Sequence, residues 1–344
     1  MVKTEYYKDL TKMNTFGMKV KARCFIEYDS VADLVDIEFE ELARPVLHIG
    51  GGSNLLFTDD FKGTVLHSKI DFIEILDEGP EVLVSVGAGV VFDDFCAWAA
   101  KEGLWGVENL SYIPGEVGAS AVQNIGAYGV EVKDVIRRVY CYDTVEEEFG
   151  NFSVEECGYG YRDSIFKDPE VKGRYVVTHV VFALSRTPQP RLDYGHLKAA
   201  VESAGSDLTP ALIRKVIIKI RKEKLPEPSV MGSAGSFFKN PVISAEHFAR
   251  IEAAAKAEHG PDYKVPHYDL PDGTVKVPAA WMIEQCGWKG KSVGKVAVHG
   301  SQALVLINKG GANGVDIINL SDSIRASVRE KFEIELTPEV NLIF

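Results

Sequence analysis

Ser236 is the residue whose surroundings most directly raise the question of chemistry. It lies in the segment MGSAGSFFKNP, residues 231–241, where glycines and an alanine precede it and two phenylalanines follow it. Small residues let another molecule approach the main chain closely, and a hydroxyl group beside aromatic rings sits in a partly dry environment that strengthens its hydrogen bonds. The segment is compatible with a reactive serine and with a serine that only turns a corner.

Three charged residues also stand in unusual settings. Arg162 is embedded in the aromatic segment YGYRDSIFK, where it can pair with an acid such as Asp163 or hold the carboxylate of a ligand in bidentate fashion. Lys224 falls at the expected end of a helix, before LPEP, a position that compensation of the helix dipole explains by itself. Glu339 opens an otherwise apolar C-terminal segment and either faces solvent or points into a cleft.

Two glycine-rich segments could bind an anion with main-chain groups alone. Residues 50–54 read GGGSN, and residues 115–129 read GEVGASAVQNIGAYG. Successive N–H groups in such turns form concave sites for phosphate oxygens, and a pair of loops suits a dinucleotide with two ends. Two tight turns remain the alternative, more so for the first segment than for the second, in which Gln123 and Asn124 could bond the edge of a ring system.

Several standard motifs fail when they are tested. The dinucleotide fingerprint that starts at Gly50 needs a sixth-position glycine where Leu55 stands, and a phosphate-binding loop ending in GKS at 290–292 needs a glycine where Gln285 stands. No zinc-protease or nucleophile-elbow motif occurs, and neither the histidines nor the cysteines have a metal-binding spacing. We therefore expect no metal site.

The elements that must position these residues can be read from hydrophobic periodicity and punctuation. Strands are predicted at 46–49, 82–86, 132–142, 175–184, 303–307 and 340–344, and helices at 92–101, 210–224, after Ser244, at 279–286 and at 315–332. The stretch 103–129, rich in small residues, is predicted to be a long functional loop. The LPEP segment gives the best domain boundary.

Composition excludes several classes of function. The chain has 344 residues and a formal net charge of −12 without a long basic run, which argues against binding to nucleic acid or to an anionic membrane. The N-terminus has no apolar signal region, so a cytoplasmic location is expected. The five cysteines, at 24, 96, 141, 157 and 286, are widely spaced and are expected to be buried thiols.

Seven segments in order carry a resemblance to a known family: IGGGSNLL, IPGEVGASAVQNIGAYG, YGYRDSIFK, KLPEP, GSAGSFFKNP, HGSQALVLIN and TPEV. Together they resemble the UDP-N-acetylenolpyruvoylglucosamine reductases, the MurB family, over nearly the whole chain. The RLDYGHL segment resembles the longer subtype, in which a tyrosine loop covers the substrate nucleotide.

The resemblance implies an α+β fold, with a split FAD-binding domain of the vanillyl-alcohol-oxidase (PCMH) type and a separate α/β substrate-binding domain. The implied FAD-binding region is about 17–188. It comprises subdomain 1 at 1–66, to which 335–344 could return as a strand, and subdomain 2 at 67–225. The substrate-binding domain is then 226–334.

The resemblance also implies a reaction. FAD, bound non-covalently, and NADPH as reductant would convert UDP-N-acetylglucosamine enolpyruvate to UDP-N-acetylmuramate, a precursor of peptidoglycan. Ser236 matches the family's proton donor, Arg162 would hold the substrate carboxylate, and Glu339 would help to stabilise the enol-like intermediate. The partner is a small molecule, and we expect a monomer.

The remaining contacts are likewise implied by the resemblance. The cofactor contacts are Gly50, Gly51, Gly52, Ser53, Asn54, Pro114, Gly115, Gly118, Ala119, Gln123, Asn124, Gly126, Ala127, Tyr128 and Gly129. The contacts with the UDP portion are Tyr194, Lys224, Asn240 and Gln302. Relatives often have an arginine two residues after the final glutamate, and Asn341 stands there in this chain.

Two other functions remain open at this point. One is a different oxidase or dehydrogenase with the same FAD fold; such enzymes often attach the flavin through histidine or cysteine, and neither glycine-rich segment contains either residue. The other is a nucleotide-sugar-binding protein that has lost the reaction, against which the presence of Arg162, Ser236 and Glu339 speaks.

Overall fold

The computed structural model describes residues 1–205, 207–227 and 230–344. It divides into two compact units. The first contains Met1–Leu10, Val20–Ser53 and Asp60–Glu223, and the second contains Thr11–Lys19, Asn54–Asp59 and Lys224–Phe344. The predicted boundary motif LPEP ends at Pro228, which lies outside the described residues. The predicted domain limits stay a prediction.

The first unit contains a four-stranded mixed sheet in the order β1-β2-β5-β3. Its strands are β1 (Lys3–Asp9), β2 (Lys21–Tyr28), β3 (Val46–Ile49) and β5 (Phe61–Ser68), and helix α1 (Val31–Val35) follows β2. Both β2 and β3 run parallel to β5. Because parallel strands end at the same edge of a sheet, the end of β5 lies beside Gly50, the residue that follows β3.

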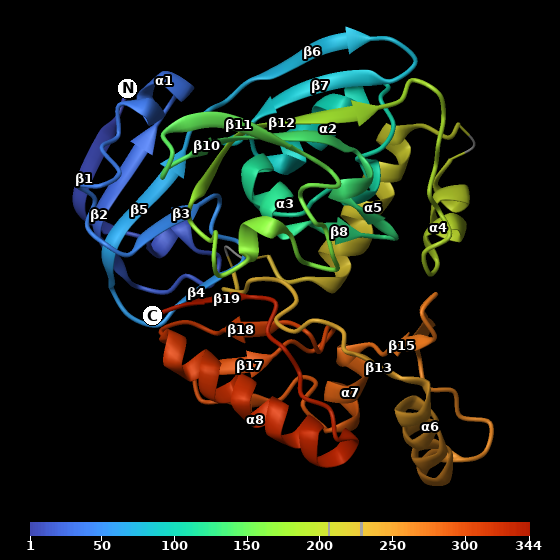
Figure 1. Ribbon diagram of the computed structural model, residues 1–344. Coiled ribbons are helices and arrows are strands. Elements are labelled where there is room, and N and C mark those ends of the chain that lie inside the picture. The colour runs from blue at the N-terminus through green and yellow to red at the C-terminus, as the bar shows by residue number, and fades with distance from the viewer. Residues whose placement is uncertain (206, 228–229) are drawn as a thin grey trace. The chain divides into compact units, whose positions relative to one another are not determined.

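The second sheet of this unit is antiparallel and has the order β11-β10-β12-β7-β6. Its strands are β6 (Ile73–Glu78), β7 (Val82–Gly87), β10 (Ile136–Asp143), β11 (Glu148–Ser153) and β12 (Tyr175–Leu184). Helices α2 (Phe92–Lys101) and α3 (Val117–Gln123) lie on one of its faces (Figure 1). The rings of Phe95 on α2 and Phe182 on β12 lie 4.7 Å apart in the shared core.

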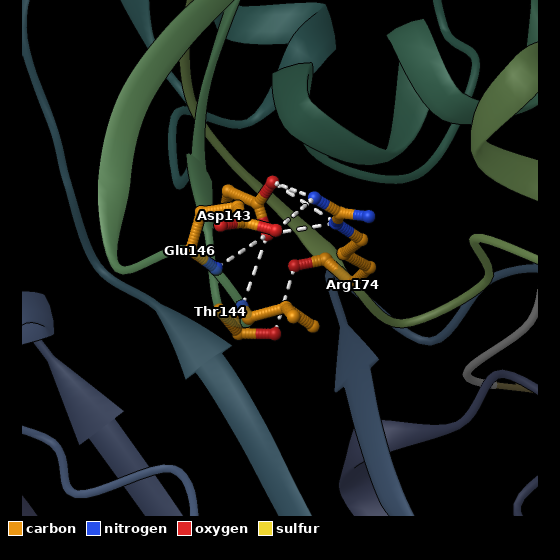
Figure 2. A network of polar contacts seen from close by, with 5 residues as sticks. Asp143, Thr144, Glu146 and Arg174 are labelled. Carbon is orange, nitrogen blue, oxygen red and sulfur yellow. Dashed lines mark hydrogen bonds and ion pairs between the residues drawn. The ribbon is translucent and has the colours of Figure 1, made fainter.

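A polar network fastens one end of this sheet (Figure 2). Asp143, the last residue of β10, accepts bonds from Nε and Nη2 of Arg174 at 2.8 and 2.6 Å, and Arg174 immediately precedes β12. The Thr144 N–H and hydroxyl groups both donate to the Arg174 carbonyl, at 3.0 and 2.9 Å. Arg174 therefore joins the end of β10 to the start of β12 through both its main chain and its side chain.

The rest of the first unit covers this core. It contains the short strands β8 (Gly126–Ala127) and β9 (Val130–Glu131), and helices α4 (Leu197–Ala204) and α5 (Pro210–Lys224). The hydroxyl of Thr209 accepts a bond from the Leu212 N–H at 3.1 Å, which confirms the predicted start of α5. The 3₁₀ helices among the described residues are η2 (Glu108–Leu110), η3 (Val132–Asp134) and η4 (Ile165–Lys167) in the first unit and η1 (Thr11–Met13) in the second.

The second unit contains three small sheets. The first is β13 (Val242–Ser244), β14 (Tyr268–Asp269) and β15 (Thr274–Lys276); the second is β16 (Ser292–Val293), β17 (Val296–Val298) and β18 (Leu306–Asn308); the third pairs β4 (Leu55–Phe57) in parallel with β19 (Asn341–Ile343). Its helices are α6 (Ala245–His259), α7 (Ala279–Gln285) and α8 (Gly314–Phe332). The predicted cap of α6 is confirmed, because the Ser244 hydroxyl accepts a bond from the His247 N–H at the start of this helix.

Two segments distant in sequence are built into this unit. Asn308 Nδ2 donates to the carbonyl of Phe16 at 3.0 Å, and both residues are buried. A Cβ added at Gly232 would lie 2.1 Å from that same carbonyl, and one added at Gly314 would lie 2.1 Å from the carbonyl of Phe57. Both glycines are therefore required by a close approach of two main chains.

Three predictions of local structure were wrong. The stretch 103–129 is not a structureless loop, since it contains η2 and α3, whose Val117 and Ala121 are fully buried in the core. The strand predicted from 132 begins at Ile136, after η3. The strand predicted from 303 begins at Leu306, because a turn closed by a 3.0 Å bond from the Val305 N–H to the Gln302 carbonyl precedes it.

None of the helices in the described part of the chain has the length and apolar character needed to cross a membrane.

Candidate active site

Residues 50–53 of the first predicted cofactor loop adjoin the second loop within the first unit. A Cβ added at Gly51 would lie 3.3 Å from the Cα of Gly115, and the hydroxyl of Ser53 donates to the Pro114 carbonyl at 2.8 Å. Gly51 and Pro114 are exposed. Two nearly bare main chains that lie side by side and reach the surface fit an elongated anionic group, so the residues present fit the FAD that the resemblance implies.

The second loop is folded around α3 rather than extended. Asn124 ends α3 in the left-handed conformation, with φ 49°, and is fully buried. Its Nδ2 donates to the Gly160 carbonyl at 2.8 Å and to Glu131 at 3.1 Å, while its Oδ1 accepts from the Lys133 N–H at 3.3 Å. Both hydrogens of the side-chain amide are thus used within the protein, and Asn124 holds the loop in shape.

Arg162 is attached to this same loop. Its Nη1 donates to the carbonyl of Asn124 at 3.2 Å and its Nη2 to the carbonyl of Gly126 at 2.6 Å. A Cβ at Gly126 would lie 2.8 Å from Nη1, so position 126 must be glycine for the guanidinium to reach it. These two carbonyl groups position the guanidinium, whose planar fork of N–H donors matches the geometry of a carboxylate.

Two neighbours stabilise the unusual backbone of Arg162, whose φ is +54°. Lys167 Nζ donates to the Arg162 carbonyl at 2.8 Å and to Gln123 Oε1 at 2.9 Å. The hydroxyl of Ser164 donates to the Val122 carbonyl on α3 at 2.6 Å. A left-handed arginine is costly unless its surroundings impose it, and these bonds do so.

Tyr194 also lies beside the second loop. Its ring is 5.9 Å from that of Tyr128 in an edge-to-face arrangement, and its Cβ is 3.6 Å from the position of a Cβ at Gly129. About half of its surface is exposed, 47%. A large ring on the surface next to the loop is suitably placed to cover a bound nucleotide.

Ser236 and Glu339 are neighbours in the second unit. The Phe237 N–H donates to the Leu304 carbonyl and the Glu339 N–H donates to the Phe237 carbonyl, each at 2.8 Å. Gly235, with φ 68°, provides the turn immediately before Ser236. The segment therefore does turn a corner, and main-chain bonds fix both predicted catalytic residues within one small network.

Two predicted substrate residues lie in the same unit and are partly used by the protein. Asn240 Oδ1 accepts from the Ala279 N–H, at the first residue of α7, at 2.9 Å. Gln302 Oε1 accepts from the Leu304 N–H at 3.3 Å. Lys224 is the last residue of α5 and stands where the chain passes from the first unit to the second.

Sequence reasoning missed a second cationic network in the first unit. Arg214 binds both carboxylate oxygens of Asp93, which also accepts a bond from the Tyr112 N–H. Arg221 Nε donates to the Tyr112 carbonyl at 3.0 Å. Burial lowers the pKa of Arg221, although the neighbouring Tyr128 acts in the opposite direction. The network joins α5 to Asp93 on α2 and to the main chain of Tyr112, which precedes the second loop.

A signal for this network was present in the sequence. Arg214 and Arg221 are seven residues apart, so they share one face of a helix with the buried Ile217. Charged residues on an apolar face are unusual and suggest a specific partner. The acidic partner, Asp93, is 121 residues from Arg214 in the sequence and could not be identified from the pattern.

Comparisons with known proteins agree with this arrangement. Residues 22–146 match a family model described as FAD binding domain, and residues 227–343 match one described as UDP-N-acetylenolpyruvoylglucosamine reductase, C-terminal domain. A UDP-N-acetylenolpyruvoylglucosamine reductase from Bacteroides fragilis strain YCH46 is 53% identical over 97% of this chain and 98% of its own length. One from Neisseria meningitidis serogroup C is 48% identical over 98% and 96%.

A solved structure agrees in fold. The MurB reductase of Thermus caldophilus superimposes with a TM-score of 0.67 over 99% of this chain and 98% of that one, at 22% identity. At this identity the likeness concerns the fold alone. Together with the match to an FAD-binding domain, it confirms the predicted fold class.

Proposed function

The chain belongs to the UDP-N-acetylenolpyruvoylglucosamine reductase family, and from this membership we infer that it reduces UDP-N-acetylglucosamine enolpyruvate to UDP-N-acetylmuramate. It is an FAD-dependent oxidoreductase of peptidoglycan synthesis with NADPH as reductant. When bound, FAD supplies the hydride that it has received from NADPH. The residue roles that follow are our proposals.

Arg162 binds the carboxylate of the enolpyruvyl group. Addition of hydride to the terminal carbon leaves negative charge next to that carboxylate, and a group that holds the charge lowers the barrier. The guanidinium is positioned in advance by the carbonyls of Asn124 and Gly126, at 3.2 and 2.6 Å, so it need not reorganise during the reaction. Its fork geometry matches a carboxylate.

Ser236 donates the proton that completes the reduction, and Glu339 helps to stabilise the enol-like intermediate. The observation that carries this assignment is the 2.8 Å bond from the Glu339 N–H to the Phe237 carbonyl, because it keeps both residues in one rigid network. A serine hydroxyl is a poor acid in water, so it acts through exact placement and through a nearby positive charge, for which Lys224 is our candidate.

The loops at 50–54 and 114–129 bind FAD, and Tyr194, Lys224, Asn240 and Gln302 bind the UDP portion of the substrate. Asn341, where relatives often have arginine, donates through Nδ2 to the Asn54 carbonyl at 3.2 Å and serves the pairing of β19 with β4. We further propose that the enzyme is a cytoplasmic monomer, and that through cell-wall synthesis it supports cell shape and division. The domain limits 1–66, 67–225 and 226–334 belong to the same proposal.

The test is spectroscopic. The purified protein should be yellow, should release its flavin on denaturation, should bleach when NADPH is added without oxygen, and should regain its colour when enolpyruvyl-UDP-N-acetylglucosamine follows. Flavin that stays with the precipitated protein would favour an oxidase with a covalent flavin. Absence of reoxidation by the substrate would contradict the proposed reaction.

A further inference from the structure

His67, the penultimate residue of β5, is bonded to a carboxylate at each of its ring nitrogens. Nδ1 lies 3.1 Å from Oε1 of Glu27 and Nε2 lies 3.0 Å from Oε1 of Glu116. Only 5% of the surface of His67 is exposed. Carboxylate oxygens accept and do not donate, and a neutral imidazole has one N–H group. Bonds to two ionised carboxylates can therefore form together only when the ring carries both protons.

The elements around His67 place its ring near the first glycine loop. In the sheet His67 is paired with Glu27 of β2 on one side and with Ile49 of β3 on the other. The residue after Ile49 is Gly50, and a Cβ at Gly50 would lie 3.2 Å from Oε2 of Glu116. The carboxylate of Glu116 thus lies between His67 and the loop.

Glu116 belongs to the second glycine loop, so its side chain bridges the two loops. It occupies the N-cap position of α3 but makes no side-chain bond to the helix. The side chain instead points to His67 and is 10% exposed. Burial raises the pKa of Tyr28, and the charge of Glu116 acts in the same direction, so this neighbouring hydroxyl stays neutral and does not offset the carboxylate.

A carboxylate in this position presents an electrostatic problem. A diphosphate held by the two loops carries negative charge, and a second buried negative charge nearby would repel it. The effect is strong in a partly buried site, where solvent screens charges poorly. A positive group bonded to Glu116 removes most of the repulsion.

We propose that His67 is a positioning residue for the cofactor diphosphate: as an imidazolium held by Glu27, it neutralises Glu116 and fixes it across the two glycine loops. This rests on the proposed binding of FAD at those loops. The role distinguishes His67 from the residues that would contact FAD, because His67 acts through Glu116.

The test is a charge-exchange cycle on FAD affinity. Apoprotein of the wild type, His67→Gln, Glu116→Gln and the double variant is titrated with FAD, and binding is followed by flavin fluorescence. His67→Gln should weaken binding roughly 10- to 100-fold, the range for losing one hydrogen bond to a charged group. Glu116→Gln should bind FAD at least as tightly as the wild type, and the double variant should recover most of the loss.

Salt is a weaker test of charge, because ions screen partly buried charges much less than exposed ones. The difference in FAD affinity between His67→Gln and the double variant should therefore shrink only slightly as NaCl is raised from low to high concentration. Glu81→Gln serves as the control, since it removes an exposed carboxylate that pairs with Arg137 at 3.2 Å; its FAD affinity should stay within about threefold of the wild type.

The proposal is overturned if Glu116→Gln binds FAD more weakly than the wild type, or if the double variant is no better than His67→Gln. Either result would mean that His67 does not act by neutralising the charge of Glu116. If His67→Gln fails to fold, the FAD affinity of Glu116→Gln alone tests the proposal. Failure of the wild type to bind FAD would contradict the proposed function and not this inference.

Discussion

Arg162 and Ser236 are held in place by different means. Around Arg162, side chains bind the main chain of residues 122–126. The Arg162 guanidinium donates to the carbonyls of Asn124 and Gly126, and the Ser164 hydroxyl donates to the carbonyl of Val122. At Ser236 the main chain holds itself, through the bonds of Phe237 with Leu304 and Glu339. In our proposal the Arg162 side chain therefore serves both architecture and chemistry, whereas at Ser236 the main chain provides the architecture and the side chain the chemistry.

The largest effect is expected at Ser236. Ser236→Ala removes the proposed proton donor but none of the main-chain bonds around it, so kcat should fall by roughly 10²–10⁴ while FAD affinity and the melting temperature stay unchanged. Steady-state kinetics, flavin titration and calorimetry check the three quantities. Ser233→Ala, in the same segment, is the matched control and should keep wild-type kcat. Normal turnover of Ser236→Ala would disprove the proton-donor role.

Arg162→Lys comes second and should affect both properties at once. Lysine keeps the charge but loses the fork, so kcat/KM should fall about 100-fold, and loss of the bonds to Asn124 and Gly126 should also lower the melting temperature and shift the flavin absorption bands. Arg174→Lys makes the same exchange in the network of Figure 2 and should leave kcat/KM unchanged. Wild-type stability and spectrum in Arg162→Lys would show that the Arg162 side chain does not hold the main chain of the second loop.

The pair of Asp93 with Arg214 contributes to stability and not to the proposed chemistry, and its contribution should depend on pH. Although burial raises the pKa of Asp93, the bonds from Arg214 and from the Tyr112 N–H outweigh it and leave the pKa below its usual value. The stabilisation is therefore complete above about pH 4 and is lost as pH falls through the folded pKa. Asp93→Asn should cost about 2 kcal/mol of unfolding free energy at pH 7 and progressively less in acid.

Melting temperatures of wild type and Asp93→Asn between pH 3 and pH 8 measure this difference. The neighbouring exposed Asp94 gives the control, and Asp94→Asn should follow the wild type at every pH. A gap between wild type and Asp93→Asn that did not close in acid would show that shape, and not the charge of the carboxylate, stabilises this pair.

The smallest effect is expected at Ser164. Ser164→Ala removes one bond to α3, worth about 1 kcal/mol, so kcat/KM should fall only a few-fold because Arg162 is held less firmly. Ser203→Ala, which removes a bond within α4, should leave kcat/KM unchanged. Equal kinetics in the two serine variants would show that the bond from Ser164 to α3 does not help to hold Arg162.

The sequence predicted elements whose signals are local. Helices that begin at Thr209 and Ser244 were placed by their caps, and strand 175–184 by its apolar run. The small residues of 103–129 hid α3, because a helix of Gly, Ala, Ser and Val has the composition of a loop and is stabilised by burial rather than by propensity. Its position depends on contacts that the sequence does not display.

The site divides in the same way. The glycine loops and Ser236 were predicted as site residues from composition and from the family resemblance, since chemistry restricts the residue types there, and they stay predictions. The anchors of Arg162 and the link from His67 to Glu116 join residues 36 to 49 positions apart, and no local pattern announces such pairs. Their partners become apparent only when the loops and strands are folded.

The contact between Phe16 and Asn308 has a consequence for synthesis on the ribosome. The two residues are 292 positions apart, so at typical elongation rates of about 5–20 residues per second Phe16 waits roughly 15–60 s for its partner. Residues 54–59 must wait in the same way for β19, which is translated last. Early-made apolar segments of a late-completed unit are natural binding sites for chaperones on the nascent chain.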